Sequence, residues 1–335
     1  MSKLNFAIIG CGRIAERHAK HIQGMANLVS VCDINKDKAD MLARKYNCNS
    51  LYRIDDLLCQ KNNIDVVSIC TPNGLHAEHT VKSLKAGCHV LCEKPMAIRV
   101  KDCGNMIIEA EKSNKKLFIV KQNRFNPPVV ALKKIMDENR LGEITNFQIN
   151  CFWNRNEEYY RDSNWKGKKD MDGGTLFTQF SHFIDLLYWI VGDVKNVYPI
   201  LRNQQHQGMM EFEDSGAVAI ELETGAIGTL NYNVNSYKKN MEGSITLFGE
   251  NGTVKVGGQY LNTLEYQFID GFEIAGLPES SPANDYGAYQ GSMSNHDKVY
   301  ENVIEVLTNN GAVTTSGYEG LKTVEIIEKI YKSVL

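Results

Sequence analysis

The chain has 335 residues, of which 43% are hydrophobic and 23% are charged, and its formal net charge at pH 7 is −3. This composition is typical of globular proteins and excludes the strongly basic character of most nucleic-acid-binding domains. No apolar stretch approaches the roughly 18 residues of a membrane-spanning helix, and no long apolar leader follows Met1. We therefore expect a cytoplasmic protein of two domains, with neither a nucleic-acid nor a membrane partner.

The cysteines number nine and are scattered through mostly apolar surroundings. An odd, scattered set is typical of reduced, buried thiols rather than of a disulfide framework. The closest pair, Cys88 and Cys92, lacks both the spacing of a zinc knuckle and a second pair of ligands. The sequence thus predicts no structural metal.

The first apolar segment, residues 4–9, predicts a strand that leads into Gly10-Cys11-Gly12-Arg13-Ile14-Ala15 at the start of a predicted helix. This is the dinucleotide-binding pattern G-x-G-x-x-A. Gly10 permits the tight turn, Gly12 lets the backbone approach a pyrophosphate, and Ala15 lets helix and strand pack closely.

A second predicted strand, residues 28–32, ends in Asp33, which lies 21 positions beyond Gly12. A carboxylate at this place accepts hydrogen bonds from the adenosine ribose and repels a 2′-phosphate. The sequence therefore predicts NAD rather than NADP. The residues expected to hold it in this first part are Gly10, Gly12, Arg13, Ile14 and Asp33.

The alternation of strand and helix continues with a strand over 65–70, a turn at Thr71-Pro72-Asn73-Gly74 and a helix over 75–86. Because the turn lies at the carboxyl end of a strand, Thr71, Pro72 and Asn73 can meet the phosphate and ribose of a cofactor, although a simple turn remains the alternative. His76 and His79 are expected on the helix surface, since further metal ligands are not evident.

The strand over 89–92 ends in Glu93-Lys94-Pro95. In an open α/β sheet, ligands bind at the carboxyl ends of the strands, so Lys94 is a candidate to meet substrate and cofactor, with an ordinary surface lysine as the alternative. Pro95 also restricts the backbone of Lys94. After a helix over 99–112 and a strand over 117–121, we expect an NAD-binding Rossmann domain to end at 122, followed by a substrate-binding and oligomerisation domain over 123–335.

In the second half, Asn126 and Pro127 form the N-cap and first residue of a predicted helix that ends near Asn139. Alternating residues from 147 to 153 predict a strand, and 218–234 and 245–256 predict hairpins. We expect an α+β domain with a large, open, mainly antiparallel sheet. Such a sheet buries one face under helices and can offer the other to a partner subunit.

Between the first of these strands and the hairpins lies a long segment, 154–172, rich in aromatic residues and cations. Its length favours a functional, lid-like loop, and its side chains suit a sugar ring and a diphosphate; a solvated basic loop is the alternative. Gly173-Gly174 then opens a predicted helix to about Val191. Thr178, His182 and Asp185 share a stripe away from its apolar face, so His182 is interpreted as cleft-facing rather than as a packing residue.

Taken together, Gly10-x-Gly12-x-x-Ala15, Glu93-Lys94-Pro95 and His182-x-x-Asp185 resemble the Gfo/Idh/MocA oxidoreductases over essentially the whole chain. More narrowly, Lys121-Gln-Asn-Arg-Phe-Asn-Pro127, Tyr159-Tyr160, Trp165-Lys166-Gly167, Asp172-Gly-Gly174, Gln179-x-x-His182 and Asn240-Met-Glu-Gly243 resemble the UDP-N-acetylglucosaminuronate 3-dehydrogenases of bacterial surface-sugar pathways. The resemblance implies NAD, a homotetramer or homodimer joined through the sheets, and oxidation at C3 of a UDP-linked N-acetylated uronic acid. The product would be a 3-keto sugar for a following aminotransferase in O-antigen or related lipopolysaccharide biosynthesis.

The site residues that follow from the motifs and this resemblance form two further sets. Expected at the cofactor are Thr71, Pro72, Asn73, His76, Glu93, Lys94, Gln122, Trp165 and Lys166; expected at the substrate are Lys94, Arg124, Arg155, Tyr160, Arg161, Thr178, Gln179 and His182. We expect Arg124, Arg155, Arg161 and Lys166 to act as a group on the diphosphate. The chain departs from many relatives in having Thr178 where they have Asp, four residues before the histidine, and Lys166 where they have Arg.

Oxidation of a secondary alcohol needs a base, and the candidates are Lys94 and His182. A lysine pKa would have to fall from about 10.4 to about 7, at a cost of about 4 kcal/mol, whereas a histidine starts at about 6.5. We therefore assign His182 as base and Lys94 as the charged group that orients the hydroxyl and stabilises the alkoxide. A buried, desolvated Lys94 could reverse the roles. The alternatives for the whole protein are an inositol or free-sugar dehydrogenase and a non-catalytic NAD(H)-sensing regulator.

Overall fold

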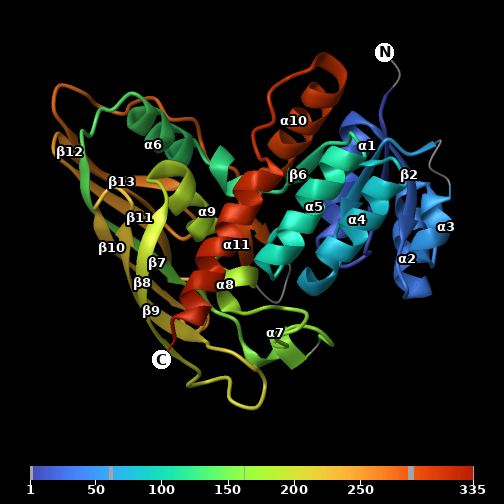
Figure 1. Ribbon diagram of the computed structural model, residues 1–335, viewed down its shortest axis with the longest axis horizontal. Helices are drawn as coiled ribbons and strands as arrows, with labels where there is room; N and C mark the ends of the chain where they lie inside the picture. Colours follow the sequence, from blue (N-terminus) through green and yellow to red (C-terminus); the bar gives the residue numbers. More distant parts are fainter. Residues whose placement is uncertain (1–2, 60–62, 162, 286–289, 335) are drawn as a thin grey trace. The chain divides into compact units, whose positions relative to one another are not determined.

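The computed structural model describes residues 3–59, 63–161, 163–285 and 290–334, and its elements are labelled in Figure 1. Its internal contacts divide the chain into two units. The first consists of Met1–Lys121 with His296–Val324, and the second of Gln122–Asn295 with Glu325–Leu335. Residues 296–324, which the sequence-based boundary leaves in the second domain, make their contacts within the first unit, because the chain returns to it.

The first unit is built on a parallel sheet of six strands in the order β3-β2-β1-β4-β5-β6. Its strands are β1 (Asn5–Ile9), β2 (Asn27–Cys32), β3 (Asn49–Leu51), β4 (Val66–Ile69), β5 (His89–Cys92) and β6 (Leu117–Ile119). Its helices are α1 (Ala15–Met25), α2 (Lys36–Tyr46), α3 (Ile54–Leu58), η2 (Asn73–Leu75), α4 (His76–Lys85), α5 (Val100–Lys112), α10 (His296–Asn309) and the first part of α11 (Gly317–Lys332). The strands read as near-continuous apolar runs because helices cover both faces of a parallel sheet.

The strand order of this sheet reverses between β1 and β4. At such a switch point the connections leave in opposite directions, and the carboxyl ends of the strands form the crevice where dinucleotides bind. The turns after β1, β2, β4 and β5 all open at this edge. The predicted Rossmann architecture is therefore confirmed.

The second unit is built on a mainly antiparallel sheet of seven strands in the order β13-β12-β11-β7-β10-β9-β8. Its strands are β7 (Ile144–Phe152), β8 (Val194–Arg202), β9 (Ser215–Leu222), β10 (Ile227–Asn233), β11 (Glu242–Gly249), β12 (Gly252–Gly257) and β13 (Thr263–Ile269); β14 (Ala283–Asp285) pairs separately with β15 (Gln290–Met293). Its helices are η3 (Gln122–Phe125), α6 (Pro127–Asp137), α7 (Glu157–Arg161), α8 (Thr175–Thr178), α9 (Ser181–Ile190) and the end of α11. The predicted hairpins are β9–β10 and β11–β12, but β10 also pairs with β7 in parallel, so the sheet is mixed.

The strand register sorts this sheet into a covered and an open face. One row across five strands, Val218, Leu230, Ile149, Ile245 and Val256, is completely buried. On this face the helices pack against the sheet, as Figure 1 shows for α6 and α9. In the adjacent row, which faces the opposite side and runs from Tyr198 to Tyr266, every residue is exposed or half-buried, so this face is open.

One local expectation for the second unit is wrong, and another is confirmed in position but not in its side-chain contact. The predicted helix over 174–191 is two helices, α8 and α9, because the backbone at Phe180 leaves the helical region and its ring packs on Trp153 and Tyr232 of the sheet side. Asn126 and Pro127 are the N-cap and first residue of α6, as predicted, but the Asn126 side chain makes no cap; it donates to the carbonyl oxygens of Tyr260 and Leu261, which ties the helix start to the loop between β12 and β13.

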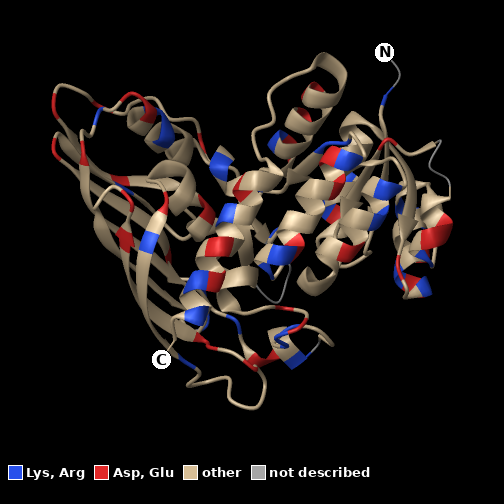
Figure 2. Cartoon of the chain, in the orientation of Figure 1, with Lys and Arg blue, Asp and Glu red and all other residues tan. Residues whose placement is uncertain are grey.

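Charged side chains are interspersed along the helices of both units, with both signs on most of them (Figure 2). Among the described helices, none combines the length and the apolar composition that crossing a membrane requires.

Candidate active site

The turn between β1 and α1 has the geometry that its glycines predict. Gly10 has a φ of +93°, and a Cβ placed on it would lie 2.7 Å from the carbonyl carbon and oxygen of Cys70. Gly12 is exposed, and nothing lies within 4 Å of its hypothetical Cβ. The N-cap residue of α1 is Ile14, whose side chain makes no capping hydrogen bond. The open backbone around Gly12, at the start of α1, fits the approach of the pyrophosphate of a dinucleotide.

Asp33 lies at the end of β2, half-buried beside that turn. Its Oδ2 accepts a hydrogen bond of 2.7 Å from the backbone N–H of Cys11, and its Oδ1 accepts one of 2.8 Å from Asn35. The carboxylate is thus fixed next to the glycine turn, where ribose hydroxyls can donate to its remaining lone pairs. The residues present therefore fit NAD.

His76 and His79 are both buried, so the expectation of surface histidines is wrong. One ring nitrogen of His76 lies 2.7 Å from the carbonyl oxygen of Pro95 and the other 2.8 Å from that of Thr71. Burial lowers the pKa of His76, although both carbonyls favour its cation. The ring braces the turns that follow β4 and β5, the two turns that carry predicted cofactor residues. Whether His76 also contacts the cofactor stays a prediction.

The carboxylate of Glu93 is buried immediately before Lys94. Its Oε1 accepts a hydrogen bond of 2.9 Å from His18, and its Oε2 accepts one of 3.0 Å from the backbone N–H of Lys94. The Nε2 of His296 lies 3.4 Å from the same Oε1. Burial opposes the charge, but His18 and His296 hold the pKa of Glu93 well below its usual value. Lys94 is half-buried and precedes a cis peptide bond to Pro95.

A chain of hydrogen bonds extends this cluster into the core of the first unit. Tyr300 from α10 lies 2.7 Å from Nδ1 of His18 and 3.0 Å from the hydroxyl of Ser68. Ligand atoms of His18, Glu93 and His296 lie within 4.8 Å of one another, a grouping of residue types that can hold a metal ion. Since His18 already uses both ring nitrogens and Glu93 both oxygens, we interpret the cluster as a support for the Lys94 turn. Sequence reasoning missed it because His296 and Tyr300 are remote in the chain.

In the second unit, His182 lies in the first turn of α9 and is buried. Its Nε2 lies 3.5 Å from Nε2 of Gln122 and 3.5 Å from the hydroxyl of Ser292. Gln122 is expected at the cofactor, and the structure also brings its amide to this histidine. Ser292, on β15, was not predicted, because nothing in its surroundings in the sequence marks it.

Asp185, one turn after His182, forms a buried ion pair with Arg124. The Nε and Nη2 of Arg124 lie 2.8 and 2.7 Å from the two carboxylate oxygens, and the guanidinium stacks over Trp189. This two-pronged pair holds η3 against α9. The donors that face Asp185 are committed to it, and a contact of Arg124 with a diphosphate stays a prediction.

The cations of segment 154–172 have different environments. Arg155 is buried, with its guanidinium 5.1 Å from the ring centroid of Trp153 and 5.3 Å from that of Tyr159. The ammonium of Lys166 lies 3.4 Å from the Tyr159 centroid. Arg161 is exposed and pairs with Glu157 on α7 at 2.6 Å. Arg155 and Lys166 therefore gather on one aromatic ring, whereas Arg161 lies on the surface.

The aromatic neighbours of these cations are partly in the interior. Tyr160 is buried with Tyr159 and Met210, and its hydroxyl has no hydrogen-bond partner among the described residues. Trp165 is half-buried. The amide of Gln179 donates to the Tyr159 hydroxyl at 3.3 Å, while its oxygen is buried without a described partner. Buried polar atoms left without partners are typical of places that a ligand completes.

Thr178 bonds to a carboxylate that lies six residues earlier. Its hydroxyl donates to Asp172, which is completely buried and also accepts a hydrogen bond of 2.8 Å from the N–H of Gly167. The position that carries Asp in many relatives is thus a threonine that is hydrogen-bonded to the carboxylate of Asp172. The Asp172-Gly-Gly motif marked the position but not this contact.

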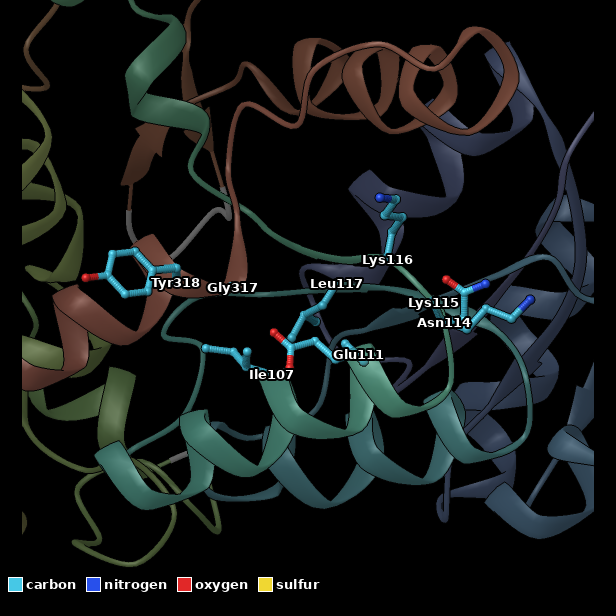
Figure 3. Close-up of a pocket in the computed structure, with 9 residues that line it drawn as sticks. Ile107, Glu111, Asn114, Lys115, Lys116, Leu117, Gly317 and Tyr318 are labelled. Carbon is cyan, nitrogen blue, oxygen red and sulfur yellow. The ribbon is translucent and has the colours of Figure 1, made fainter.

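A surface cavity of about 330 Å³ lies elsewhere in the first unit, between α5 and the start of α11 (Figure 3). Lys116 and Leu117, at the beginning of β6, line it together with Ile107 and Tyr318. Of the strands, only β6 contributes to this lining, through its first residue, and the lining residues are not among those predicted for the cofactor or the substrate.

The strand order, the glycine turn and Asp33 define a dinucleotide-binding protein of the Rossmann class. Residues 4–121 match the oxidoreductase family with an NAD-binding Rossmann fold, and residues 129–255 match the GFO/IDH/MocA C-terminal domain. The chain belongs to the Gfo/Idh/MocA family. It is an oxidoreductase, and its cofactor is NAD.

Solved structures extend the likeness over the full length. The chain is similar to the WlbA dehydrogenase from Bordetella pertussis, solved with NADH and UDP-GlcNAcA, with 34% identity, a TM-score of 0.88 and coverage of 99% of this chain and 96% of that one. The WlbA dehydrogenase from Chromobacterium violaceum, in complex with the same two ligands, also has 34% identity, with a TM-score of 0.89 and coverage of 99% and 94%. The inositol 2-dehydrogenase of Rhizobium meliloti is 25% identical over 99% of this chain and 97% of its own length.

Proposed function

We propose that this NAD-dependent sugar dehydrogenase oxidises the C3 hydroxyl of a UDP-linked N-acetylated uronic acid to a 3-keto sugar. The observation that carries the proposal is the likeness, at 34% identity over nearly the whole chain, to two dehydrogenases bound to NADH and UDP-GlcNAcA. The pathway that this substrate implies is the biosynthesis of bacterial surface polysaccharide such as O-antigen. Assembly into a homotetramer or homodimer through the open sheet belongs to the same proposal.

In the proposed reaction, two side chains have different roles. NAD, when bound, accepts the hydride. Nε2 of His182 takes the hydroxyl proton, because an imidazole is neutral near pH 7 at almost no cost. Lys94, as an ammonium, orients the hydroxyl and stabilises the developing alkoxide. That Lys94 of the first unit and His182 of the second reach one substrate is part of the prediction.

We assign the nucleotide part of the substrate to the second unit. Arg155 and Lys166 supply positive charge beside the Tyr159 ring, and Arg124 and Arg161 complete the group of four cations predicted at the diphosphate. Cations and aromatic faces are suited to a diphosphate next to a planar base or sugar ring. If neutralising Arg155, Arg161 and Lys166 together leaves the affinity for UDP-GlcNAcA unchanged in calorimetry, this assignment is wrong.

A turnover screen tests the function. The purified protein, with NAD, is offered UDP-GlcNAcA, UDP-N-acetylglucosamine, myo-inositol and glucose, and the appearance of NADH is followed by absorbance. We expect the highest kcat/KM for UDP-GlcNAcA. A higher value for myo-inositol would favour an inositol dehydrogenase, in line with the similarity to the Rhizobium meliloti enzyme. If no sugar reduces NAD, a sensing role replaces the proposal.

The roles of the catalytic pair are tested by substitution. His182→Asn is expected to lower kcat by about 100-fold or more, the usual contribution of a general base, and to abolish the acidic limb of the pH profile. Lys94→Met is expected to lower kcat while leaving that limb in place. Near-normal turnover of His182→Asn, together with loss of the limb in Lys94→Met, would exchange the two roles.

A further inference from the structure

We propose that Ser292 is a positioning residue which, with Gln122, keeps Nε2 of His182 unprotonated and directed at the substrate hydroxyl. The inference rests on the proposed role of His182 as base and adds to it two residues from other elements. Ser292 comes from β15 and Gln122 from η3, so three separate parts of the second unit meet at one ring nitrogen.

The direction of the hydrogen bonds follows from the donors present. The amide nitrogen of Gln122 can only donate, and it donates to the Ser292 hydroxyl oxygen at 2.9 Å. The Ser292 hydrogen is therefore free to point at Nε2 of His182, 3.5 Å away. The second hydrogen of the Gln122 amide faces the same nitrogen at 3.5 Å. Such contacts are long in a ligand-free site and shorten when the reacting group binds.

Two donors facing one ring nitrogen favour the tautomer in which that nitrogen carries a lone pair. A proton on Nε2 would face the N–H of Gln122, which cannot accept it, and Ser292 could accept it only by turning its own hydrogen away. The neutral imidazole with its proton on Nδ1 is therefore the form that this arrangement stabilises. It is also the form that a general base requires.

A second observation indicates that a ligand completes this place. The Oε1 of Gln122 is buried and has no hydrogen-bond partner among the described residues. A buried carbonyl oxygen without a donor costs free energy unless a ligand or water supplies one. When the substrate hydroxyl takes the place of the two donors at Nε2 of His182, Oε1 of Gln122 offers a second acceptor beside it, which fits a secondary alcohol with a second hydroxyl or N–H group on a neighbouring carbon.

The charged groups on the elements packed around α9 are engaged in contacts with other residues. Asp185 on α9 and Arg124 on η3 neutralise each other in their ion pair. On α6, Lys133 lies over Trp189 of α9. Ahead of α8, Asp172 is held by Thr178 and Gly167. None of these contacts competes with Ser292 or Gln122 for Nε2.

The test compares Ser292→Ala with the wild type, with Ser292→Thr as the variant that keeps the hydroxyl. Ser294→Ala, two residues on and half-buried, is the matched control. We expect Ser292→Ala to lower kcat/KM at pH 7 about tenfold, the effect of one lost hydrogen bond to the base. The acidic limb of its pH profile should move to higher pH, while Ser292→Thr restores most of the rate and Ser294→Ala matches the wild type.

A readout without turnover separates this inference from the proposed function. The His182 ring nitrogens are titrated by NMR in the free protein and assigned by their absence in His182→Asn. If the wild type oxidises a different sugar, or none, the proposed function fails, yet the titration still reports whether Ser292→Ala makes Nε2 easier to protonate. Superimposable titrations of wild type and Ser292→Ala, or a loss of stability without any shift, would overturn the role of Ser292.

Discussion

Glu213 is a buried carboxyl group placed between two tyrosines of the second unit. It lies 2.7 Å from the hydroxyl of Tyr331 on α11 and 3.0 Å from that of Tyr232 on β10. Burial raises its pKa to about 7, and the two hydrogen bonds offset only part of that effect. The carboxyl therefore changes charge in the neutral range, within the core that supports α8 and α9.

The pH dependence of stability should reveal this group. A carboxyl whose folded pKa is raised to about 7 binds a proton in the folded state between pH 4.5 and 7 that the unfolded chain has released, so stability falls as pH rises through this window. We expect Glu213→Gln, which mimics the neutral acid, to be more stable than the wild type at pH 8, by at most about 3 kcal/mol, and equal to it near pH 4.5. Thermal unfolding of both proteins from pH 4.5 to 8 measures the difference. A constant difference would contradict the assignment.

At the residue scale, the sequence predicted what neighbours along the chain determine. Gly10 and Asp33 could be assigned because a turn and the residue that ends the next strand have fixed places in this fold. The contacts of Glu93 with His296 and of His182 with Ser292 could not, because each joins residues more than 100 positions apart. No local sequence pattern indicates a contact between residues so far apart in the chain.

At the scale of elements, the strands and helices that apolar runs predicted in the first unit are confirmed, whereas α2, β3, α3 and α10 were not predicted. The second unit was harder because packing overrides periodicity there. The apolar spacing of 176–191 predicts one continuous helix, but Phe180 packs on Trp153 and breaks it into α8 and α9. As a result, Thr178 and His182 do not share one uninterrupted helix, and the stripe read from the sequence exists only in part.

The topology of the second sheet illustrates the same limit. Its hairpins were predicted because each is local, with a turn between two adjacent strands. The parallel pairing of β7 with β10 joins strands that are far apart in the chain, and only the assembled sheet shows it. Segment 154–172 and α8–α9, which hold most predicted substrate residues, lie between these two strands in the sequence.

At the scale of the whole molecule, the open face of the second sheet is the feature that a single chain leaves unexplained. In the register of the strands, Tyr198 of β8 and Tyr266 of β13 end one row of that face, and both are more than half exposed. Ile200, Ile227 and Phe268 are exposed at similar or higher fractions. Apolar side chains gathered on an open sheet are typical of a subunit interface.

We therefore expect the protein to sediment as a homotetramer or homodimer whose subunits meet through this face. Ile200→Lys places a charge beside Tyr198 on the edge strand β8 and should shift the sedimentation coefficient toward that of a monomer, because burying an unpaired charge in an interface is costly. Ile108→Lys on α5 is the matched control, since Ile108 is equally exposed but lies in the first unit. Sedimentation velocity at several concentrations measures both. A monomeric wild type, or an Ile200→Lys variant that assembles as well as Ile108→Lys does, would show that the open face serves another purpose.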